Sequence, residues 1–167
     1  ITHIFRGESS SQDSDADIID GKGLALAPGF IDTHSHHDIG IDQEPTASAA
    51  ITQGITTIIR GMDGFSDVPE NVNVVLDNMD YFSVKEFNDY FNKIPTAINM
   101  ASFSAHNSIR IEVMKDDFKR EATAKEIRAM ASLIDLDMKS GAYGLSTGLE
   151  YDPGIFASTD EVIELAK

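Results

Sequence analysis

The stretch GFIDTHSHHDIG, residues 29–40, decides how the rest of the chain is interpreted, because it joins an apolar segment to three histidines and two aspartates. The chain has only five histidines in 167 residues, so most of them fall in this one stretch. Residues two apart on a strand point to the same face, so the imidazoles of His34 and His36 can reach one ion. Asp32 shares that face, whereas His37 points the other way. The stretch predicts either a metal site at the end of a short strand or a polar turn rich in imidazole, and the apolar residues before it favour the metal site.

Composition narrows the classes of function. Hydrophobic residues make up 41% and charged residues 25% of the chain, which is typical of a globular protein. The formal net charge of -15 argues against a nucleic-acid partner, since phosphate binding needs clustered Lys and Arg. No stretch approaches the roughly 18 apolar residues that a membrane-spanning helix needs, so we expect no membrane partner. The chain has no cysteine, so any metal must be held by nitrogen and oxygen ligands.

The pattern of elements predicts an α/β fold. A serine- and aspartate-rich loop lies within residues 1–17, and a hairpin-like turn follows at residues 20–23. Strands and helices then alternate, which predicts a parallel sheet with right-handed crossovers and fits either a doubly wound sheet or part of an eightfold barrel. The predicted strands are residues 29–36, 55–61, 96–104 and 142–148, and the predicted helices are residues 44–54, 83–94, 123–141 and 158–167.

Three of these helices begin with residues in capping-box spacing, in which a Ser or Thr hydroxyl and a Glu three residues later each bond to the other's backbone N–H. The pairs are Ser83 with Glu86, Thr123 with Glu126, and Ser158 with Glu161. In the 123–141 helix, one apolar face is formed by Ile127, Met130, Ala131, Ile134 and Met138.

Polar residues follow the later strands, at the edge where parallel folds bind ligands. Asp63, between Gly61 and Gly64, completes a metal's ligand shell or is an ordinary turn aspartate. His106 follows the third predicted strand and is either an active-site neighbour or a structural histidine. Arg110 binds a substrate carboxylate or forms a salt bridge, at the surface or between helices. In GLSTGLEYDPG, residues 144–154, the side chains that face the site or pack the loop are Ser146, Thr147, Glu150 and Tyr151.

Four motifs in order resemble the D-aminoacylase (N-acyl-D-amino-acid deacylase) family of the amidohydrolase superfamily, from about residue 17 to the end. APGFIDTHSHHD is similar to the first barrel strand, whose HxH motif supplies two metal ligands. QGITTIIRGMDGFS is similar to the second-strand segment, HNSIR to an HG/NTLR-type segment, and GAYGLSTGLEYDPG to the fourth-strand block.

The resemblance implies the first half of a TIM-like (β/α)8 barrel in residues 28–167, preceded by a remnant of a small β-sandwich in residues 1–27. It implies zinc-assisted hydrolysis of the amide of an N-acyl-D-amino acid, a small-molecule substrate, with one or two divalent cations. His34 and His36 fall on the HxH ligands. Asp63 falls where the family usually has a cysteine that ligates and bridges the metals, so a metal other than zinc is also compatible with the site.

The resemblance also implies that the remaining ligand histidines and the general-base aspartate lie beyond Lys167. The chain starts at Ile1 rather than Met and stops within a predicted helix, so we expect a fragment that is inactive and poorly stable alone. Two alternatives remain open. One is a dihydroorotase-like or isoaspartyl-dipeptidase-like amidohydrolase, although strand four lacks the lysine that those relatives generally use. The other is a non-catalytic barrel that has lost its metal.

Overall fold

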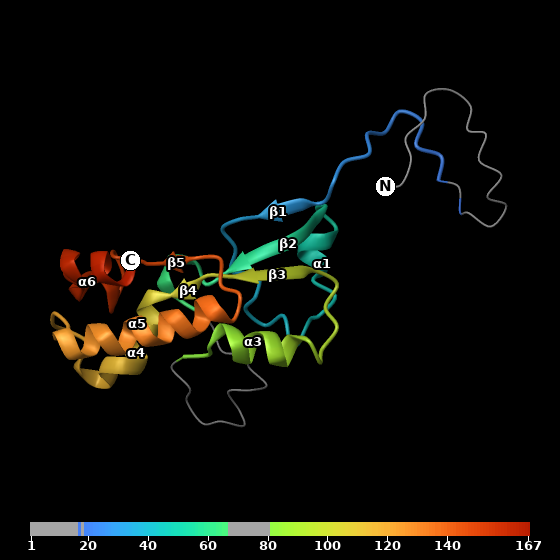
Figure 1. Cartoon of the computed structure of the whole chain (residues 1–167). Helices are drawn as coiled ribbons and strands as arrows, with labels where there is room; N and C mark the ends of the chain where they lie inside the picture. Colours follow the sequence, from blue (N-terminus) through green and yellow to red (C-terminus); the bar gives the residue numbers. More distant parts are fainter. Residues whose placement is uncertain (1–16, 18, 67–80) are drawn as a thin grey trace.

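A parallel sheet of three strands organises the chain (Figure 1). The computed structural model describes residues 17, 19–66 and 81–167. Its strands β1 (Phe30–Asp32), β2 (Ile55–Arg60) and β3 (Asn99–Ser102) lie in the order β1-β2-β3. The β-branched run of β2 suits the central position, and Ile58 is fully buried there. The prediction of an α/β fold with a parallel sheet is confirmed.

The third predicted strand, residues 96–104, is divided at Phe103. After β3 the chain forms β4 (Ser104–Ala105), which pairs in parallel with β5 (Leu145–Ser146). The N–H of Phe103 still bonds to the carbonyl of Arg60 at 3.0 Å, whereas the N–H of Ser104 bonds to Gly144 at 2.8 Å. The strands therefore follow one another in chain order across this break, as they do in a barrel, without the reversal of order of a doubly wound sheet.

The first strand and first helix are shorter than predicted. The strand at residues 29–36 ends at Asp32, because its carboxylate accepts a hydrogen bond from the N–H of His34 at 3.2 Å and turns the chain. The helix at residues 44–54 contracts to α1 (Ser48–Ile51), because Ala47 adopts a left-handed backbone with φ of 44°. Gly54, at φ of 81°, ends this segment as predicted.

The helices α3 (Val84–Phe91) and α5 (Ala124–Lys139) each begin with the complete predicted capping box. The third predicted box forms only half. At the start of α6 (Thr159–Leu165) the Ser158 hydroxyl accepts the N–H of Glu161 at 3.1 Å. The Glu161 carboxylate points instead into the protein, where a buried arginine and histidine bind it.

One helix was not predicted. The helix α4 (His106–Met114) follows β4 directly, and its first five residues are all buried. Because four of these five residues are polar, the segment lacks the apolar periodicity by which a helix is recognised in sequence. Single 3-10 turns occur at η1 (Met62–Gly64), η2 (Lys115–Asp117) and η3 (Gly154–Phe156).

The helices α3, α4 and α5 gather on one side of the strands (Figure 1). Two apolar clusters form the core of the described residues. One lies between α4, α5 and α6, and the other joins Ile58 of β2 to Ile41, Ala50 and Ile98. Met130 and Ile134 of the predicted α5 face lie in the first cluster, whereas Met138 is 45% exposed. The buried Asp137 of α5 joins the layers, accepting the N–H of Val84 at 2.9 Å and the hydroxyl of Ser104 at 2.8 Å.

The N-terminal segment lies apart from this core. Most of residues 1–17 fall outside the described part of the chain, and residues 19–29 form no strand, only a turn closed by the N–H of Leu24 on the carbonyl of Gly21. Ile19 and Leu26 are each 90% exposed. The β-sandwich remnant stays a prediction. None of the described helices combines the length and apolar character needed to cross a bilayer.

Candidate metal centre

The carboxyl ends of β1 and β2 bring His34, His36 and Asp63 together, although 27 residues or more separate the aspartate from the histidines. The Oδ2 atom of Asp63 lies 3.3 Å from Nε2 of His34 and 3.2 Å from Nε2 of His36. The two imidazole centroids are 5.9 Å apart, with the rings inclined at 72°. Both rings thus turn one nitrogen toward the same carboxylate oxygen.

A tight turn places Asp63 in this position. The residue has φ of 54° and ψ of 23°, in the left-handed region that non-glycine residues rarely adopt. The flanking Gly61 and Gly64 also have positive φ. A Cβ at Gly61 would lie 2.6 Å from the carbonyl oxygen of Phe103, so this position accepts only glycine unless the backbone at Phe103 shifts. The sequence RGMDGF therefore folds back sharply and aims the carboxylate at the histidines.

The electrostatics of the three residues favour an anionic Asp63. Desolvation raises the pKa of its carboxyl, but hydrogen bonding and charge interactions with His36 and His34 outweigh this effect and hold the pKa below its ordinary value. The site is open on one side, since the side chains of His34 and His36 are 60% and 45% exposed. In the part of the chain that the structure describes, an ion and water can reach it.

The donor set fits a divalent cation. The three ligand atoms lie within 4.8 Å of one another. Ligands about 2.1 Å from one tetrahedral zinc ion would be separated by about 3.4 Å, close to the 3.2 and 3.3 Å seen here. Two neutral imidazoles and one carboxylate are ordinary zinc ligands, and they leave a fourth position for water or substrate.

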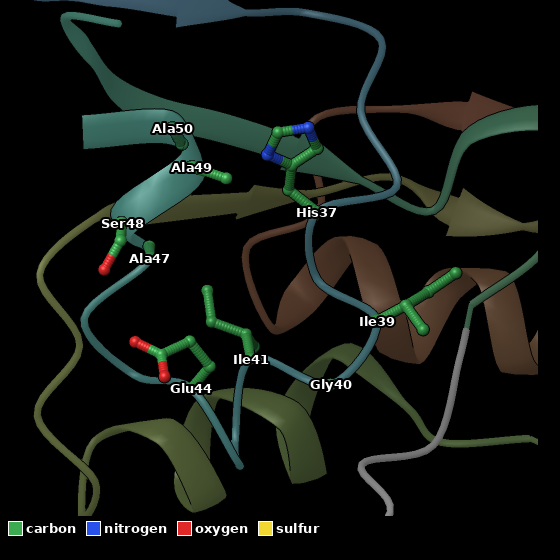
Figure 2. Close-up of a pocket in the computed structure, with 9 residues that line it drawn as sticks. All are labelled: His37, Ile39, Gly40, Ile41, Glu44, Ala47, Ser48, Ala49 and Ala50. Atoms are coloured by element: carbon green, nitrogen blue, oxygen red, sulfur yellow. The ribbon is translucent and has the colours of Figure 1, made fainter. Parts of the chain in front are cut away.

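The other acidic and imidazole groups of residues 29–40 have different partners. His37 lies away from the cluster, in a pocket of about 250 Å³ between the loop after β1 and the start of α1; Figure 2 shows it there with Ile39, Ile41 and Glu44. Asp38 accepts a hydrogen bond from the buried Arg60 side chain at 3.2 Å, which fixes the loop that follows His36.

Comparison with known proteins shows the family of this chain. A sequence model of the amidohydrolase family matches residues 17–166. The chain belongs to the amidohydrolase family. An N-acyl-D-aspartate deacylase of Alcaligenes xylosoxydans xylosoxydans is 37% identical over a 159-residue alignment that covers 90% of this chain and 32% of that protein.

Solved structures of amidohydrolases show the same fold. A D-aminoacylase with a binuclear metal center matches with a TM-score of 0.71 and 35% identity. An N-acyl-D-glutamate deacylase from Bordetella bronchiseptica, complexed with zinc and a phosphonate inhibitor, matches with a TM-score of 0.72 and 31% identity. Each match covers 83% of this chain and 31% of the other, so the chain spans about a third of the length of these relatives. Its α/β fold corresponds to part of an amidohydrolase barrel.

Two of the other predicted site residues of this amidohydrolase chain lie in a buried ion-pair network between α4 and α6. His106 is 1% exposed, with Nε2 2.9 Å from Glu161 and Nδ1 2.8 Å from the hydroxyl of Thr147. Arg110 is fully buried and donates to both Glu161 oxygens at 2.5 Å. Of the interpretations of Arg110, the structure shows the inter-helix salt bridge, and a substrate contact stays a prediction for both residues.

Tyr151 lies closer to the turn that holds Asp63. Its ring centroid is 6.4 Å from that of Phe65, two residues after Asp63, and the side chain is about half exposed. Glu150 is exposed. Sequence reasoning did not single out Asn107, which packs against this turn together with Gly148. The glycines of residues 144–154 were the available signal, since a glycine permits close approach of two backbone segments.

Proposed function

We propose that this chain is the first part of the barrel of a longer protein, here called the parent, that hydrolyses the amide of N-acyl-D-amino acids with the help of a divalent metal. The observation that carries the proposal is the convergence of His34, His36 and Asp63 at the carboxyl ends of neighbouring parallel strands. The similarity to deacylases acting on N-acyl-D-aspartate and N-acyl-D-glutamate supports the choice of substrate class.

In this proposal residues 28–167 form the first half of a (β/α)8 barrel, and residues 1–27 contribute to a small β-sandwich. The chain offers three metal ligands, so the remaining ligand histidines and the general-base aspartate belong to later strands of the parent. The consecutive order of β1, β2, β3 and β5 supports this arrangement, since barrel strands follow one another around the axis.

Each residue of the candidate centre has a distinct task. His34 and His36 supply neutral nitrogen donors, and Asp63 supplies the negative charge that offsets part of the charge of the cation. When bound, such a cation lowers the pKa of a water and polarises the amide carbonyl. Tyr151, exposed beside the turn, is our candidate for substrate contact. His106 and Arg110 are buried around Glu161, and His106 also bonds to Thr147; we keep both as candidate active-site neighbours.

Zinc is the metal we expect, because two imidazoles and a carboxylate are a common catalytic set for it. The carboxylate of Asp63 is a harder donor than a thiolate, so manganese and similar ions are also acceptable to the site. The zinc-bound deacylase structure supports the choice for this family.

The test is hydrolysis of N-acetyl-D-aspartate, N-acetyl-D-glutamate and N-acetyl-D-leucine by the purified parent, with the L-enantiomers as controls. We expect release of the D-amino acid only, loss of activity on chelation, and recovery with zinc. His36→Ala should abolish activity, whereas the matched variant His37→Ala, in the same stretch but outside the cluster, should retain it. Activity that survives both chelation and His36→Ala would contradict the proposal.

A further inference from the structure

The turn that carries Asp63 is bonded to a side chain from another strand. Within the turn the N–H of Phe65 bonds to the carbonyl of Met62 at 3.0 Å, as in an ordinary β-turn. A second bridge joins Gly61 and Gly64. Here the hydroxyl of Ser146, on β5, donates to the carbonyl of Gly61 and accepts the N–H of Gly64 at 3.2 Å. One hydroxyl 82 residues away thus bridges the two ends of the turn, with Asp63 between them.

The surroundings of the turn leave it little room to move. A Cβ at Gly148 would collide with the carbonyl oxygen of Asp63, and a Cβ at Gly64 would lie 2.7 Å from Oδ1 of Asn107. Asn107 in turn donates to the carbonyl of Gly148 at 3.0 Å. The residues at the end of β5 and the start of α4 therefore pack closely against the turn. Ser146 is the residue whose side chain bonds to both Gly61 and Gly64.

The backbone conformation of Asp63 explains why this close packing matters. Its left-handed conformation is less favourable for a residue with a side chain than for glycine, so loss of the contacts from outside the turn would favour other conformations of Asp63. Such a change at Asp63 would redirect its carboxylate, which now lies 3.2 Å from His36 and 3.3 Å from His34. The direction of this side chain depends on contacts made by neighbouring backbone atoms.

We propose that Ser146 is a positioning residue for the metal centre: its hydroxyl holds the Gly61–Gly64 turn so that Asp63 faces His34 and His36, and thereby sets the affinity for the cation. This inference rests on the proposed function, in which Asp63 is a ligand. Ser146 itself does not touch the metal. Partners of this kind, one step removed from the ion, typically change metal affinity by about 10- to 100-fold when they are removed.

The experiment measures zinc affinity of the parent by competition with a chromophoric chelator, together with the visible absorption of the cobalt-substituted protein. Ser146→Ala is expected to bind zinc about 10- to 100-fold more weakly and to change the cobalt spectrum, which reports ligand geometry. Ser104→Ala is the matched control, since it removes a buried hydroxyl on the adjacent strand that bonds to Asp137 rather than to the turn. It should lower the melting temperature without changing zinc affinity.

A second pair of variants separates the hydroxyl from folding. Ser146→Thr keeps the hydroxyl and Ser146→Val replaces it with a methyl group in a side chain of the same shape, so Thr should retain the wild-type affinity and Val should not. Equal affinities of these two variants, or a Ser146→Ala protein that binds zinc as tightly as the wild type, would overturn the inference. A wild-type parent that binds no zinc would instead overturn the proposed function.

Discussion

Asp63 owes its position to its neighbours more than to its own preferences. The two glycines beside it permit the turn, the hydroxyl of Ser146 bonds to both ends, and the imidazoles of His34 and His36 lower the pKa of its carboxyl despite partial desolvation. The residue is thus both backbone-constrained and electrostatically poised to stay anionic, which is what a ligand for a divalent cation requires.

The chemistry of residue 63 should decide which metal the site prefers. Asp63→Cys replaces a hard oxygen with a soft thiolate, so the ratio of zinc to manganese affinity is expected to rise, while Asp63→Asn, which loses the charge, should bind both ions more weakly. Parallel titrations of the parent and the two variants with each ion give the ratio. An unchanged or lower ratio in Asp63→Cys would show that residue 63 does not contact the metal.

At this scale the sequence predicts a good deal of the candidate site. The spacing of His34 and His36 predicted that both could reach one ion. The place of Asp63 after a buried strand left an ordinary turn aspartate open, and the resemblance to the deacylase family favoured its place with the histidines. The spacing of Ser158 and Glu161 misled, because the same spacing forms complete boxes at α3 and α5. At α6 the Glu161 carboxylate binds the buried Arg110 of another helix instead of the backbone N–H of Ser158. Local sequence does not show which side chains of different helices are buried together.

The contact between α4 and α6 depends on one buried carboxylate. Glu161 binds Arg110 through both oxygens and lies 2.9 Å from His106. Removing one partner of a buried ion pair leaves the other charge uncompensated, at a cost of about 3–5 kcal/mol. Glu161→Gln should therefore lower the free energy of unfolding of the parent by about this amount in urea denaturation. Glu164→Gln, in an exposed pair with Lys167, should change it by less than about 0.5 kcal/mol, and equal effects would contradict the assignment.

The same carboxylate should make stability depend on pH. Burial raises the pKa of Glu161, but the hydrogen bonds from His106 and Arg110 lower it by more. The net result is a pKa below the ordinary value of 4.5. A lowered folded-state pKa means that the unfolded chain takes up the proton first, so this contribution is present above pH 4.5 and is lost as the pH falls toward the folded pKa. Unfolding measured from pH 7 to pH 3 should show a steeper acid loss in the wild type than in Glu161→Gln. Parallel curves would contradict this expectation.

The elements were predictable where local chemistry determines them. Two complete capping boxes fixed the starts of α3 and α5, and the β-branched run fixed β2. The helix α4 escaped prediction because its first residues are polar and buried, held by partners in other elements such as Glu161 and Gly148. The division of the third strand at Phe103 was equally hidden, since it depends on which neighbour each backbone N–H reaches.

At the scale of the whole molecule, the sheet formed by the described residues has an exposed edge at β1. The strand β1 pairs with β2 on one side, and its apolar residues Phe30 and Ile31 are 64% and 60% exposed. In a closed barrel these groups would be covered and the edge paired. The alternation of elements predicted a parallel sheet, but only the resemblance to a family favoured a barrel over a doubly wound sheet, because both architectures share that alternation.

An isolated polypeptide of residues 1–167 should therefore be inactive and should melt without a cooperative transition, whereas the parent should be active and should melt cooperatively. The physical reasons are the exposed edge and the three protein ligands, which supply part of what a catalytic centre and its general base require. Calorimetry and the D-amino-acid release assay on the two proteins make the comparison. A monomeric preparation of residues 1–167 that deacylates substrate and melts cooperatively would contradict the account.

The most direct test is a crystal structure of the zinc-loaded parent with anomalous diffraction collected at the zinc edge. We expect an anomalous peak about 2.0–2.2 Å from Nε2 of His34, Nε2 of His36 and a carboxylate oxygen of Asp63. A peak held by other residues, or a well-ordered fold in which Asp63 points away from both imidazoles, would contradict the central claim that these three side chains bind one metal.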